Sequence, residues 1–476
     1  MRLAQRQFSY TDQARFASVT GDCNPMHVDA LQARRTQAGA PVVHGIHLLL
    51  WALDSFRAAQ PDLPSLRSLR AQFNRFIYLD ELVDLEVTQQ GTAGARLAIS
   101  VSGAPRTKLS IEFGDAWRDA PTGPIPSLEE IPFLAQPVNL DFEQMSGRSG
   151  GVSFQMSKEN ATLLFPAATE WLGAGRIAAL AASSYLVGMV CPGLHSIYSA
   201  LSASACQETV SQNSLDFHVH DTDSRFRSVD LEIAGGGLIG TIKSFARTPP
   251  VRQATMQSLA GVVGPAEFAG SVALIVGGSR GLGELAAKLI ATGGGRVFIT
   301  WQSGKEDAEN VAQEIRSAGG ACQTFAYDAR KPAAEQLTQL EVTPTHIYYF
   351  ATPSIFRPQS DIFVAERLKD FLAIYVEGFW ELAHTLRARQ PKLSIFYPSS
   401  VFITERPRGM TEYTMAKAAG EILCVDMNVS LPPAHVTVSR LPRLPTDQTA
   451  SVAATEASDA LETMLPIIRE VQSWPR

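Results

Sequence analysis

The sequence predicts two kinds of fold in one chain: an α+β architecture in the N-terminal half and an α/β doubly wound parallel sheet in the C-terminal half. Two observations lead to this prediction. Before residue 250, apolar helical stretches are followed by segments in which polar and apolar residues alternate, as in antiparallel strands. After residue 271, β-like runs alternate with helical periodicity, which is typical of a parallel sheet covered by helices.

Length and composition limit the possible functions. The 476 residues are enough for about three domains. A total of 41 Lys and Arg against 47 Asp and Glu gives a net charge of −6 without a basic stripe, so we expect no nucleic-acid partner. The cysteines are scattered without a C-x-x-C pair, which indicates a reducing compartment. They are Cys23, Cys191, Cys206, Cys322 and Cys424.

Targeting signals are not evident in the sequence. The start, MRLAQRQFSY, lacks the apolar segment of an export signal. The most apolar stretch, RIAALAASSYLVGMVCPGL, contains serines, glycines and a proline, and it predicts a buried helix leading into a turn instead of a membrane span. We therefore expect a cytoplasmic protein with no membrane partner.

Three domains are predicted, at residues 1–118, 137–250 and 268–476. A proline-rich linker at about 119–136 and a second connector at 249–270 separate them. The first two domains resemble a diverged internal repeat, in which residues 40–50 align with residues 191–201. Both segments are interpreted as a turn that opens an apolar helix, and chance similarity between two helix starts is the alternative.

Strands are predicted from local sequence in all three domains. In the first domain they include ELVDLEVTQQ and ARLAISVSG, and in the second SLDFHVHD, RSVDLEIAG and GLIGTIKSFA. In the third domain they are SVALIV, RVFITW, CQTFAYD, THIYYFA, LSIFYPSS and HVTVSRL, with helical segments between most of them.

The first candidate site lies near the N-terminus. Residues 16–27 read FASVTGDCNPMH, and residues 41–45 read PVVHG. This ordered pattern closely resembles the motif of the MaoC-like, R-specific enoyl-thioester hydratases. The resemblance implies the hot dog fold, a sheet wrapped around one long helix, and two repeats would make a double hot dog.

Adding water to a conjugated C=C, or removing it, requires an acid and a base near one water molecule. Asp22 and His27 supply a carboxylate and an imidazole for these tasks. Asn24 offers an amide that anchors either the loop or the water. By resemblance, the backbone N–H of Gly45 stabilises the enolate-like thioester oxygen. The structural alternative is that Asp22 is a loop acid and His27 a surface histidine.

The second domain lacks this motif, and we interpret it as a shell that completes a tunnel for the acyl chain. His218 and His220 share one face of a predicted strand with no third ligand in view. Ordinary strand positions explain them better than a metal site, so we predict no metal.

The second candidate site begins at a glycine-rich loop between a predicted strand and a helix, which is where a dinucleotide pyrophosphate binds. Its G-x-x-x-G-x-G spacing resembles the short-chain dehydrogenase/reductase family, although Val276 replaces the usual threonine. The resemblance implies that Asp328 lies near the adenine and that Ala351 also contacts the cofactor. The loop residues implied to bind it are Gly277, Ser279, Arg280, Gly281, Leu282 and Gly283.

Tyr413 and Lys417 form the Y-x-x-x-K pattern of the same family, and Ser400 precedes Tyr413 at the family spacing. Residues four apart share a helix face, so the lysine can lower the tyrosine pKa and hold the nicotinamide ribose. Tyr413 would protonate the developing alkoxide and Ser400 would orient the carbonyl, with Ser399 as the fallback. A Y-x-x-x-K arising by chance on a surface helix is the alternative.

The predicted cofactor is NADPH. The second strand of this domain, RVFITWQSGK, has no acid at its end for a ribose 2′-OH, whereas Arg280 could pair with a 2′-phosphate. Two further departures from the family are visible. Phe350-Ala351-Thr352-Pro353 replaces N-N-A-G, and Tyr375 replaces the helix asparagine that supports a water chain to the lysine.

Together these motifs predict a bifunctional enzyme that reduces 3-oxoacyl thioesters and dehydrates the 3-hydroxyacyl product to a trans-2-enoyl thioester, in fatty acid or polyketide synthesis. The acyl carrier would be acyl carrier protein or coenzyme A, and we expect a homodimer. One alternative is an oxidative hydratase–dehydrogenase of β-oxidation that acts on coenzyme A thioesters. The other is a scaffold that binds acyl carriers and has an inactive reductase site.

Overall fold

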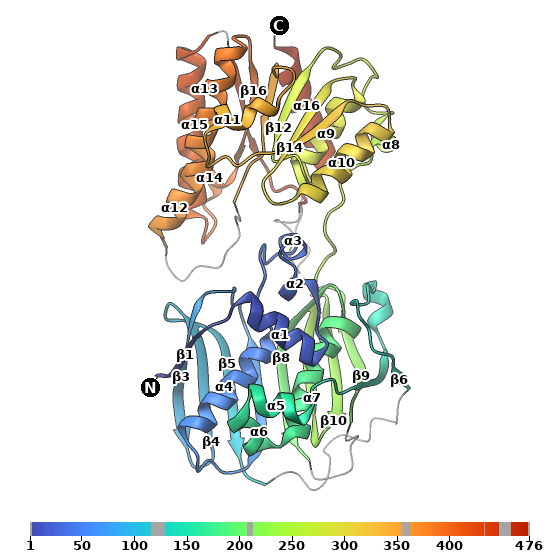
Figure 1. Cartoon of the computed structure of the whole chain (residues 1–476), viewed down its shortest axis with the longest axis vertical. Coiled ribbons are helices and arrows are strands. Elements are labelled where there is room, and N and C mark those ends of the chain that lie inside the picture. Colours follow the sequence, from blue (N-terminus) through green and yellow to red (C-terminus); the bar gives the residue numbers. More distant parts are fainter. Residues whose placement is uncertain are drawn as a thin grey trace. The chain divides into compact units, whose positions relative to one another are not determined.

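The computed structural model describes residues 2–115, 129–206, 213–353, 355, 362–432, 434–446 and 458–474. The chain divides into two compact units at Pro249 and Pro250. Both units are drawn in Figure 1.

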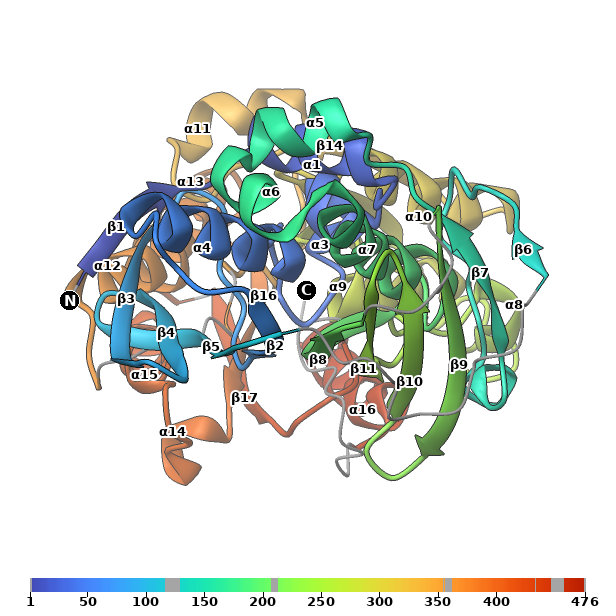
Figure 2. The ribbon, with the colours of Figure 1, turned by 90° about the horizontal axis from the view of Figure 1, so that it is seen from below.

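The N-terminal unit contains one sheet with helices on one face, antiparallel except for the parallel pair β6–β7 at its edge (Figures 1 and 2). The strands of its first half are β1 Arg2–Gln7, β2 Leu66–Phe73, β3 Leu82–Gly91, β4 Gly94–Val101 and β5 Ala104–Phe113. Those of its second half are β6 Glu130–Ile131, β7 Ser149–Ser153, β8 Ser196–Ala205, β9 Ser214–Asp223, β10 Ser228–Gly235 and β11 Leu238–Ala246.

The helices of this unit differ in length between its two halves. The first half has α1 Tyr10–Thr20, α2 Pro25–Val28, α3 Ala30–Ala33 and α4 Gly45–Ala59. The second has η1 Phe142–Met145, α5 Lys158–Leu164, α6 Pro166–Leu172, α7 Ala174–Tyr185 and the π-helical turn η2 Leu186–Val190. The apolar sides of α4 and α7 are buried against the concave face of the sheet, where they form most of the core.

The internal repeat is visible in the strand order. The sheet runs β1-β3-β4-β5-β2 and then β8-β11-β10-β9-β7-β6. In each half the strand before the long helix pairs with the second strand after it, and β2 and β8 join the halves in antiparallel register from Ser68–Ser204 to Gln72–Ala200. This topology, with one long helix for each half-sheet, confirms the predicted double hot dog fold.

One detail of the predicted repeat is wrong. Residues 191–201 do not open a helix, because Ser196–Ala205 is strand β8. The long helix of the second half, α7 with η2, comes before residues 191–201 in the chain. Residues 191–201 are therefore not the counterpart of residues 40–50. The repeated feature is therefore the order of strand, helix and four strands, and the local sequence similarity at the two turns was misleading.

The C-terminal unit is a parallel sheet with helices on both faces (Figure 1). Its strands run in the order β14-β13-β12-β15-β16-β17, which confirms the predicted doubly wound Rossmann fold. They are β12 Val272–Val276, β13 Arg296–Trp301, β14 Cys322–Ala326, β15 His346–Tyr349, β16 Ser394–Ser400 and β17 His435–Leu441. Their positions agree with all six predicted strands.

The helices of the C-terminal unit are α8 Met256–Leu259, α9 Gly281–Thr292, α10 Lys305–Ser317, α11 Ala333–Gln336, η3 Leu337–Gln339, α12 Ala365–Leu372, η4 Ala373–Gly378, α13 Phe379–Arg389, α14 Phe402–Glu405, α15 Thr411–Ser430 and α16 Ala460–Ser473. The segment that we predicted as a connector, 249–270, belongs to this unit, since Met256, Leu259 and Phe268 pack in its core.

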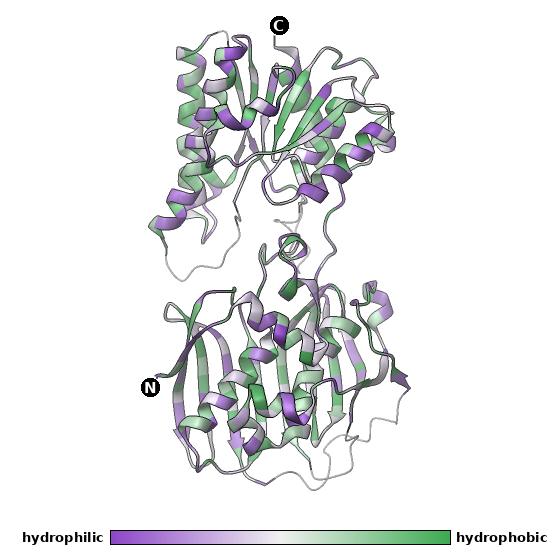
Figure 3. Ribbon diagram, viewed as in Figure 1, coloured by the Kyte–Doolittle hydropathy of each residue, from purple (hydrophilic) through white to green (hydrophobic). Residues whose placement is uncertain are grey.

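Hydropathy patterns separate the two sheets (Figure 3). Strand β5 alternates between buried and exposed positions, as a sheet with one solvated face requires. Strand β16 is buried along its whole length because helices cover both faces of its sheet. Among the described residues no single helix has the length and apolarity to cross a membrane. Helices 166–172 and 174–190 reach that composition only together, across a bend of 113°.

Candidate functional site

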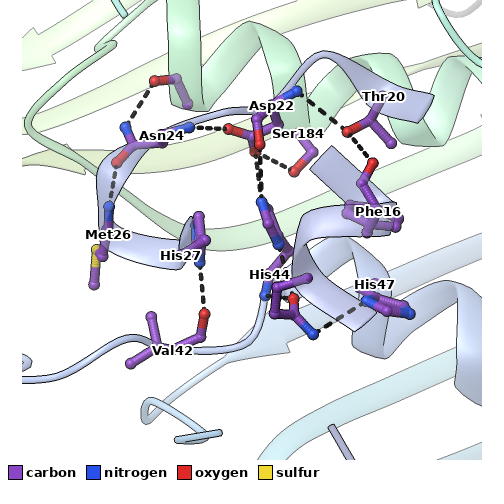
Figure 4. A network of polar contacts seen from close by, with 12 residues as sticks. Phe16, Thr20, Asp22, Asn24, Met26, His27, Val42, His44, His47 and Ser184 are labelled. Carbon is purple, nitrogen blue, oxygen red and sulfur yellow. Dashed lines mark hydrogen bonds and ion pairs between the residues drawn. The ribbon is translucent and has the colours of Figure 1, made fainter. Parts of the chain in front are cut away.

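The first candidate site lies in the N-terminal unit, where the loop after α1 meets α2, α4 and α7 (Figure 4). Helix α1 ends at Gly21, which adopts a left-handed conformation with φ 79° and turns the chain into the unit. Asp22 follows and is only 2% exposed. His27 lies on α2, and the imidazole of His44 comes from the residue before α4. One carboxylate oxygen of Asp22 and one ring nitrogen each of His27 and His44 all lie within 4.8 Å of one another.

Asn24 anchors this loop to the second half of the unit. Its Nδ2 donates to the backbone oxygens of Gly188 at 2.7 Å and Gly193 at 3.2 Å. Its Oδ1 accepts the backbone N–H of Met26 at 3.1 Å and so begins α2. Of the two roles that the sequence left open for Asn24, these contacts support the loop anchor.

The carboxylate of Asp22 has hydrogen-bond partners from both halves of the N-terminal unit. Ser184 on α7 donates its hydroxyl to Oδ2 at 2.6 Å, and the backbone N–H of Asn24 points at Oδ1 at 3.3 Å. Burial raises the pKa of Asp22, while the nearby His27 opposes that rise. The second half of the unit therefore contributes directly to the site, in addition to the predicted role of a shell.

The two histidines stack with a ring separation of 3.8 Å. His27 donates from Nδ1 to the backbone oxygen of Val42 at 2.8 Å, so its Nε2 is the nitrogen free for proton transfer. Burial lowers the pKa of His27, and the charge of Asp22 raises it. His27 is partly buried and stacked on His44, which favours a role in the site over the alternative of a surface histidine.

Gly45 begins α4, directly after His44. As the first residue of the helix it has no intrahelical acceptor for its N–H, which leaves that group available to an oxygen of a ligand. A Cβ at this position would lie 3.1 Å from the ring of Phe73, so there is little room for a side chain beside this N–H. The predicted role of Gly45 as an oxyanion donor remains a prediction.

Sequence reasoning missed three residues of this site. They are Ser184, Gln13 and, as a partner of Asp22, His44. Each is distant from the loop along the chain or belongs to no motif that assigns it a role. The signal for His44 was its place in the PVVHG segment of the motif, in which only Gly45 was assigned a role. Two imidazoles and a carboxylate could also hold a divalent cation, but our expectation of no metal stays a prediction.

The second candidate site is a pocket at the carboxyl ends of the strands in the C-terminal unit. Its lining includes Ser400, Tyr413 and Lys417 together with Arg280 and Ala351. Strand β16 ends at Ser400, and α15 presents Tyr413 and Lys417 to the same space. Sequence reasoning predicted all five of these residues, and the structure brings them together.

Lys417 is held by its immediate surroundings. Its Nζ donates to the backbone oxygen of Pro398 at 2.7 Å and lies 3.9 Å from the ring centre of Tyr375 and 4.9 Å from that of Tyr397. Burial lowers the pKa of Lys417 to about 7. Tyr375, which occupies the place of the family asparagine, thus lies against the lysine as an aromatic face.

The pKa of Tyr413 is raised by burial, and its hydrogen bond with Ser400 lowers it. We had expected Lys417 to lower the pKa of Tyr413, but in the structure the group that lowers it is Ser400. Ser399 donates its hydroxyl to Glu421 at 2.5 Å, and Arg440 pairs with that same carboxylate. Because the hydroxyl of Ser399 is occupied, Ser400 is the better candidate for orienting a carbonyl.

The glycine loop has the shape that a bound diphosphate requires. Gly277 and Gly281 have φ values of 80° and 59°, and a side chain on Gly283 would overlap the backbone oxygen of Gly277. Helix α9 begins at Gly281, so its free N–H groups open at the end of β12. Asp328 lies after β14, where its carboxylate accepts the backbone N–H of Arg330 at 3.0 Å, and it does not line the pocket.

Fold and site together define a chain with two enzyme-type units. One is a double hot dog with a buried carboxylate and imidazole, and the other is a Rossmann unit with a tyrosine and lysine on one helix. Comparison with known families gives the same division. The MaoC like domain matches residues 2–105, and the short chain dehydrogenase family matches residues 271–458. The chain therefore joins a region similar to the MaoC like domain and a region similar to the short chain dehydrogenase family.

Individual relatives match the C-terminal unit. A 3-oxoacyl-[acyl-carrier-protein] reductase, FabG, of Aggregatibacter actinomycetemcomitans is 28% identical over 167 residues, which are 32% of this chain and 69% of that protein. A solved 3-oxoacyl (acyl-carrier-protein) reductase from Agrobacterium tumefaciens with NADP bound is 16% identical, with a TM-score of 0.38, over 43% of this chain and 88% of its own. A short chain dehydrogenase from Burkholderia cenocepacia in complex with NADP is 21% identical, with a TM-score of 0.39, over 44% and 94%.

Proposed function

We propose that this protein reduces 3-oxoacyl thioesters with NADPH and removes water from the 3-hydroxyacyl product to give a trans-2-enoyl thioester. The observation that carries the proposal is the presence, in one chain, of an Asp22–His27 cluster and a Ser400–Tyr413–Lys417 cluster. The alcohol formed at the second cluster is the substrate that the first requires.

At the reductase site the hydroxyl of Ser400 and the phenol of Tyr413 would both hydrogen-bond the 3-oxo group. The raised pKa of Tyr413 keeps its proton in place at neutral pH, so the phenol can donate to the developing alkoxide. Bound NADPH would supply the hydride. Lys417 would hold the ribose and, while charged, favour loss of the phenol proton.

At the dehydratase site one group would remove a proton from Cα and the other would protonate the leaving hydroxyl. His27, with a free Nε2, is suited to the first task, and the raised pKa of Asp22 suits it to the second. The N–H of Gly45 would bind the thioester oxygen, where negative charge develops. Addition of water would use the same groups in reverse.

NADPH is favoured over NADH by charge. Strand β13 ends at Trp301 and is followed by Gln302 and Ser303, so no acid stands where a ribose 2′-OH would need one. Arg280, at the start of α9, lines the pocket and would pair with a 2′-phosphate. The FabG relative is a 3-oxoacyl reductase, which agrees with this substrate class.

The remaining parts of the proposal concern partners and location. The thioester would be carried by acyl carrier protein or coenzyme A, in a biosynthetic route for fatty acids or polyketides. The protein would act in the cytoplasm as a homodimer. An exposed apolar stripe on α15, formed by Met415, Ile422, Val425 and Val429, supports association between copies.

The test is to follow NADPH consumption with short 3-oxoacyl groups on both carriers and to detect the enoyl product by mass spectrometry. We expect oxidation of NADPH followed by a product lighter by one water. If the protein only oxidises 3-hydroxyacyl-coenzyme A at cellular cofactor ratios, it is a β-oxidation enzyme instead. If NADPH does not bind, as measured by its fluorescence, the scaffold alternative is favoured.

A further inference from the structure

The buried amide of Gln13 determines where one hydrogen atom of His44 lies. Its Oε1 accepts the backbone N–H of His44 at 3.1 Å, which identifies that atom as the amide oxygen, since a backbone N–H only donates. The same oxygen lies 2.8 Å from Nδ1 of His44. Nδ1 therefore carries a hydrogen and donates it to Gln13.

The opposite nitrogen of His44 also faces oxygen atoms (Figure 4). Its Nε2 lies 3.1 Å from the backbone oxygen of Asp22 and 3.8 Å from the carboxylate Oδ2. A backbone oxygen is only an acceptor, so a bare Nε2 would oppose two lone pairs inside a buried site. With a hydrogen on Nε2 the contact becomes a hydrogen bond, and a ring with both hydrogens is an imidazolium.

His27 is in a different position. Its Nδ1 donates to Val42, and within the described residues no protein group hydrogen-bonds its Nε2. The stacked rings of His27 and His44 lie 3.8 Å apart, so a positive charge on one disfavours a positive charge on the other. Hydrogen bonding thus selects His44 as the charged ring and leaves His27 neutral.

We propose that His44 is a positioning residue of the dehydratase site, which holds one proton in common with Asp22 as an ion pair in the resting site, returns that proton to Asp22 when Asp22 protonates the leaving hydroxyl, and leaves His27 uncharged to accept the proton from the substrate. This inference rests on the proposed dehydratase function. Burial raises the pKa of Asp22 and lowers that of His44, so it disfavours each charge taken singly, while the hydrogen bond of His44 to the backbone oxygen of Asp22 favours the charged ring.

Few other titratable groups face this pair. Cys23 is adjacent to Asp22 in the chain, and Tyr185 on α7 is influenced by the charge of Asp22. His47, one turn further along α4, faces Gln13 and has a pKa lowered to about 3 by burial, so it is neutral at any working pH. His47 therefore offers a matched control on the same helix.

The first experiment compares His44→Gln with His47→Gln in the full-length protein, by the pH dependence of kcat and KM for hydration of an enoyl thioester. We expect His44→Gln to move the acid limb of the profile up by one pH unit or more, because Asp22 loses its cation, and to lower kcat tenfold or more with little change in KM. His47→Gln should leave the limb in place. A loss of kcat in His44→Gln without any movement of the limb would overturn the proposal.

The second experiment reads the charge without catalysis. In wild-type protein labelled with ¹⁵N-histidine, one histidine whose signals vanish in His44→Gln should show both ring nitrogens in the protonated range at pH 7. A single unprotonated nitrogen at this residue would refute the ion pair. If wild-type protein instead shows no hydration or dehydration, the proposed function fails while the nitrogen spectrum still decides the state of His44. Reductase activity of the variant verifies that the rest of the chain is intact.

Discussion

Asp22 is a buried carboxylate whose partners come from residues far apart in the chain. Ser184 approaches it from α7, and Asn24 holds the loop against Gly188. A buried carboxylate without such partners would be protonated and unable to act as a base. At the scale of single residues, the chemistry of this site therefore depends on side chains that no local motif contains.

Replacing Asp22 by Asn removes the carboxylate with almost no change in size. We expect water removal from a 3-hydroxyacyl thioester to fall by about 10²-fold or more, since a positioned acid or base contributes that much. Reduction of the 3-oxo group should be unchanged, because the second site lies in a separate unit. Separate assays of the two steps, on the same preparation, measure this. Loss of both steps together would contradict independent sites.

Tyr413→Phe should have the reverse effect. The ring contacts with Phe371 and Phe402 are retained, whereas the acidic proton is lost. NADPH oxidation with a 3-oxoacyl substrate should decrease by about 10²-fold or more, while dehydration of a 3-hydroxyacyl thioester continues. If reduction stays intact, another phenol donates the proton, and Tyr375 in the same pocket is the first candidate.

Lys417 predicts a pH dependence of the reductase. With its pKa lowered to about 7, the side chain is charged below that pH and neutral above it, so kcat/KM for reduction should fall as the pH rises through this value. The ring of Tyr375 stabilises the charged form. Tyr375→Leu should move the fall to lower pH by about one unit, given roughly 1–2 kcal/mol for a buried cation–π contact. Tyr375→Phe keeps the aromatic face and should leave the profile unchanged.

The sequence was sufficient to identify those site residues that belong to ordered motifs. The predicted residues lie together within each site, namely Asp22 with His27, and Ser400 with Tyr413 and Lys417. Short spacing on a helix or at a strand end determines their relative positions. Residues such as Ser184 could not be found, since only the packing of α7 against the loop brings a common serine to the carboxylate. The change in the pKa of Tyr413 likewise depends on burial, which sequence does not give.

At the scale of elements, the turn η2 leaves space for the carboxylate of Asp22 in the loop after α1. Gly188 lies in this turn, and a Cβ on it would overlap the carboxylate of Asp22. Gly188→Ala should therefore displace Asp22 and reduce dehydration on the order of tenfold or more, with reduction unaffected. Gly91→Ala is the matched control, because the space around Gly91 is open. Equal effects of the two variants on dehydration would contradict the steric argument.

Element prediction succeeded where the hydrophobic period was clear. All six strands of the parallel sheet were predicted because each is an apolar run between helical segments. The segment Ser196–Ala205 was misread as a helix start, since its small residues fit either structure. Its pairing with β2 and β11 determines that it is a strand, and such long-range pairing is not encoded in local sequence.

At the scale of the whole molecule, the stripe on α15 predicts association between copies. Ile422, Val425 and Val429 are 65%, 61% and 77% exposed. Burying them against a second copy would stabilise a dimer by roughly 25 cal/mol for each Å² of apolar surface removed from water. We expect Ile422→Glu together with Val425→Glu to shift the protein toward monomer in sedimentation experiments, with Glu462→Gln on α16 as a surface control. An unchanged dimer would place the interface elsewhere.

The hydrogen-bonded junction of β2 and β8 has one more consequence. In an assembly of two identical hot dog chains, every substitution appears twice, so both copies must keep the reactive groups. Covalent fusion ends that symmetry. One half holds the acid and the imidazole, and the other supplies a serine that hydrogen-bonds the carboxylate and a glycine that leaves room for it.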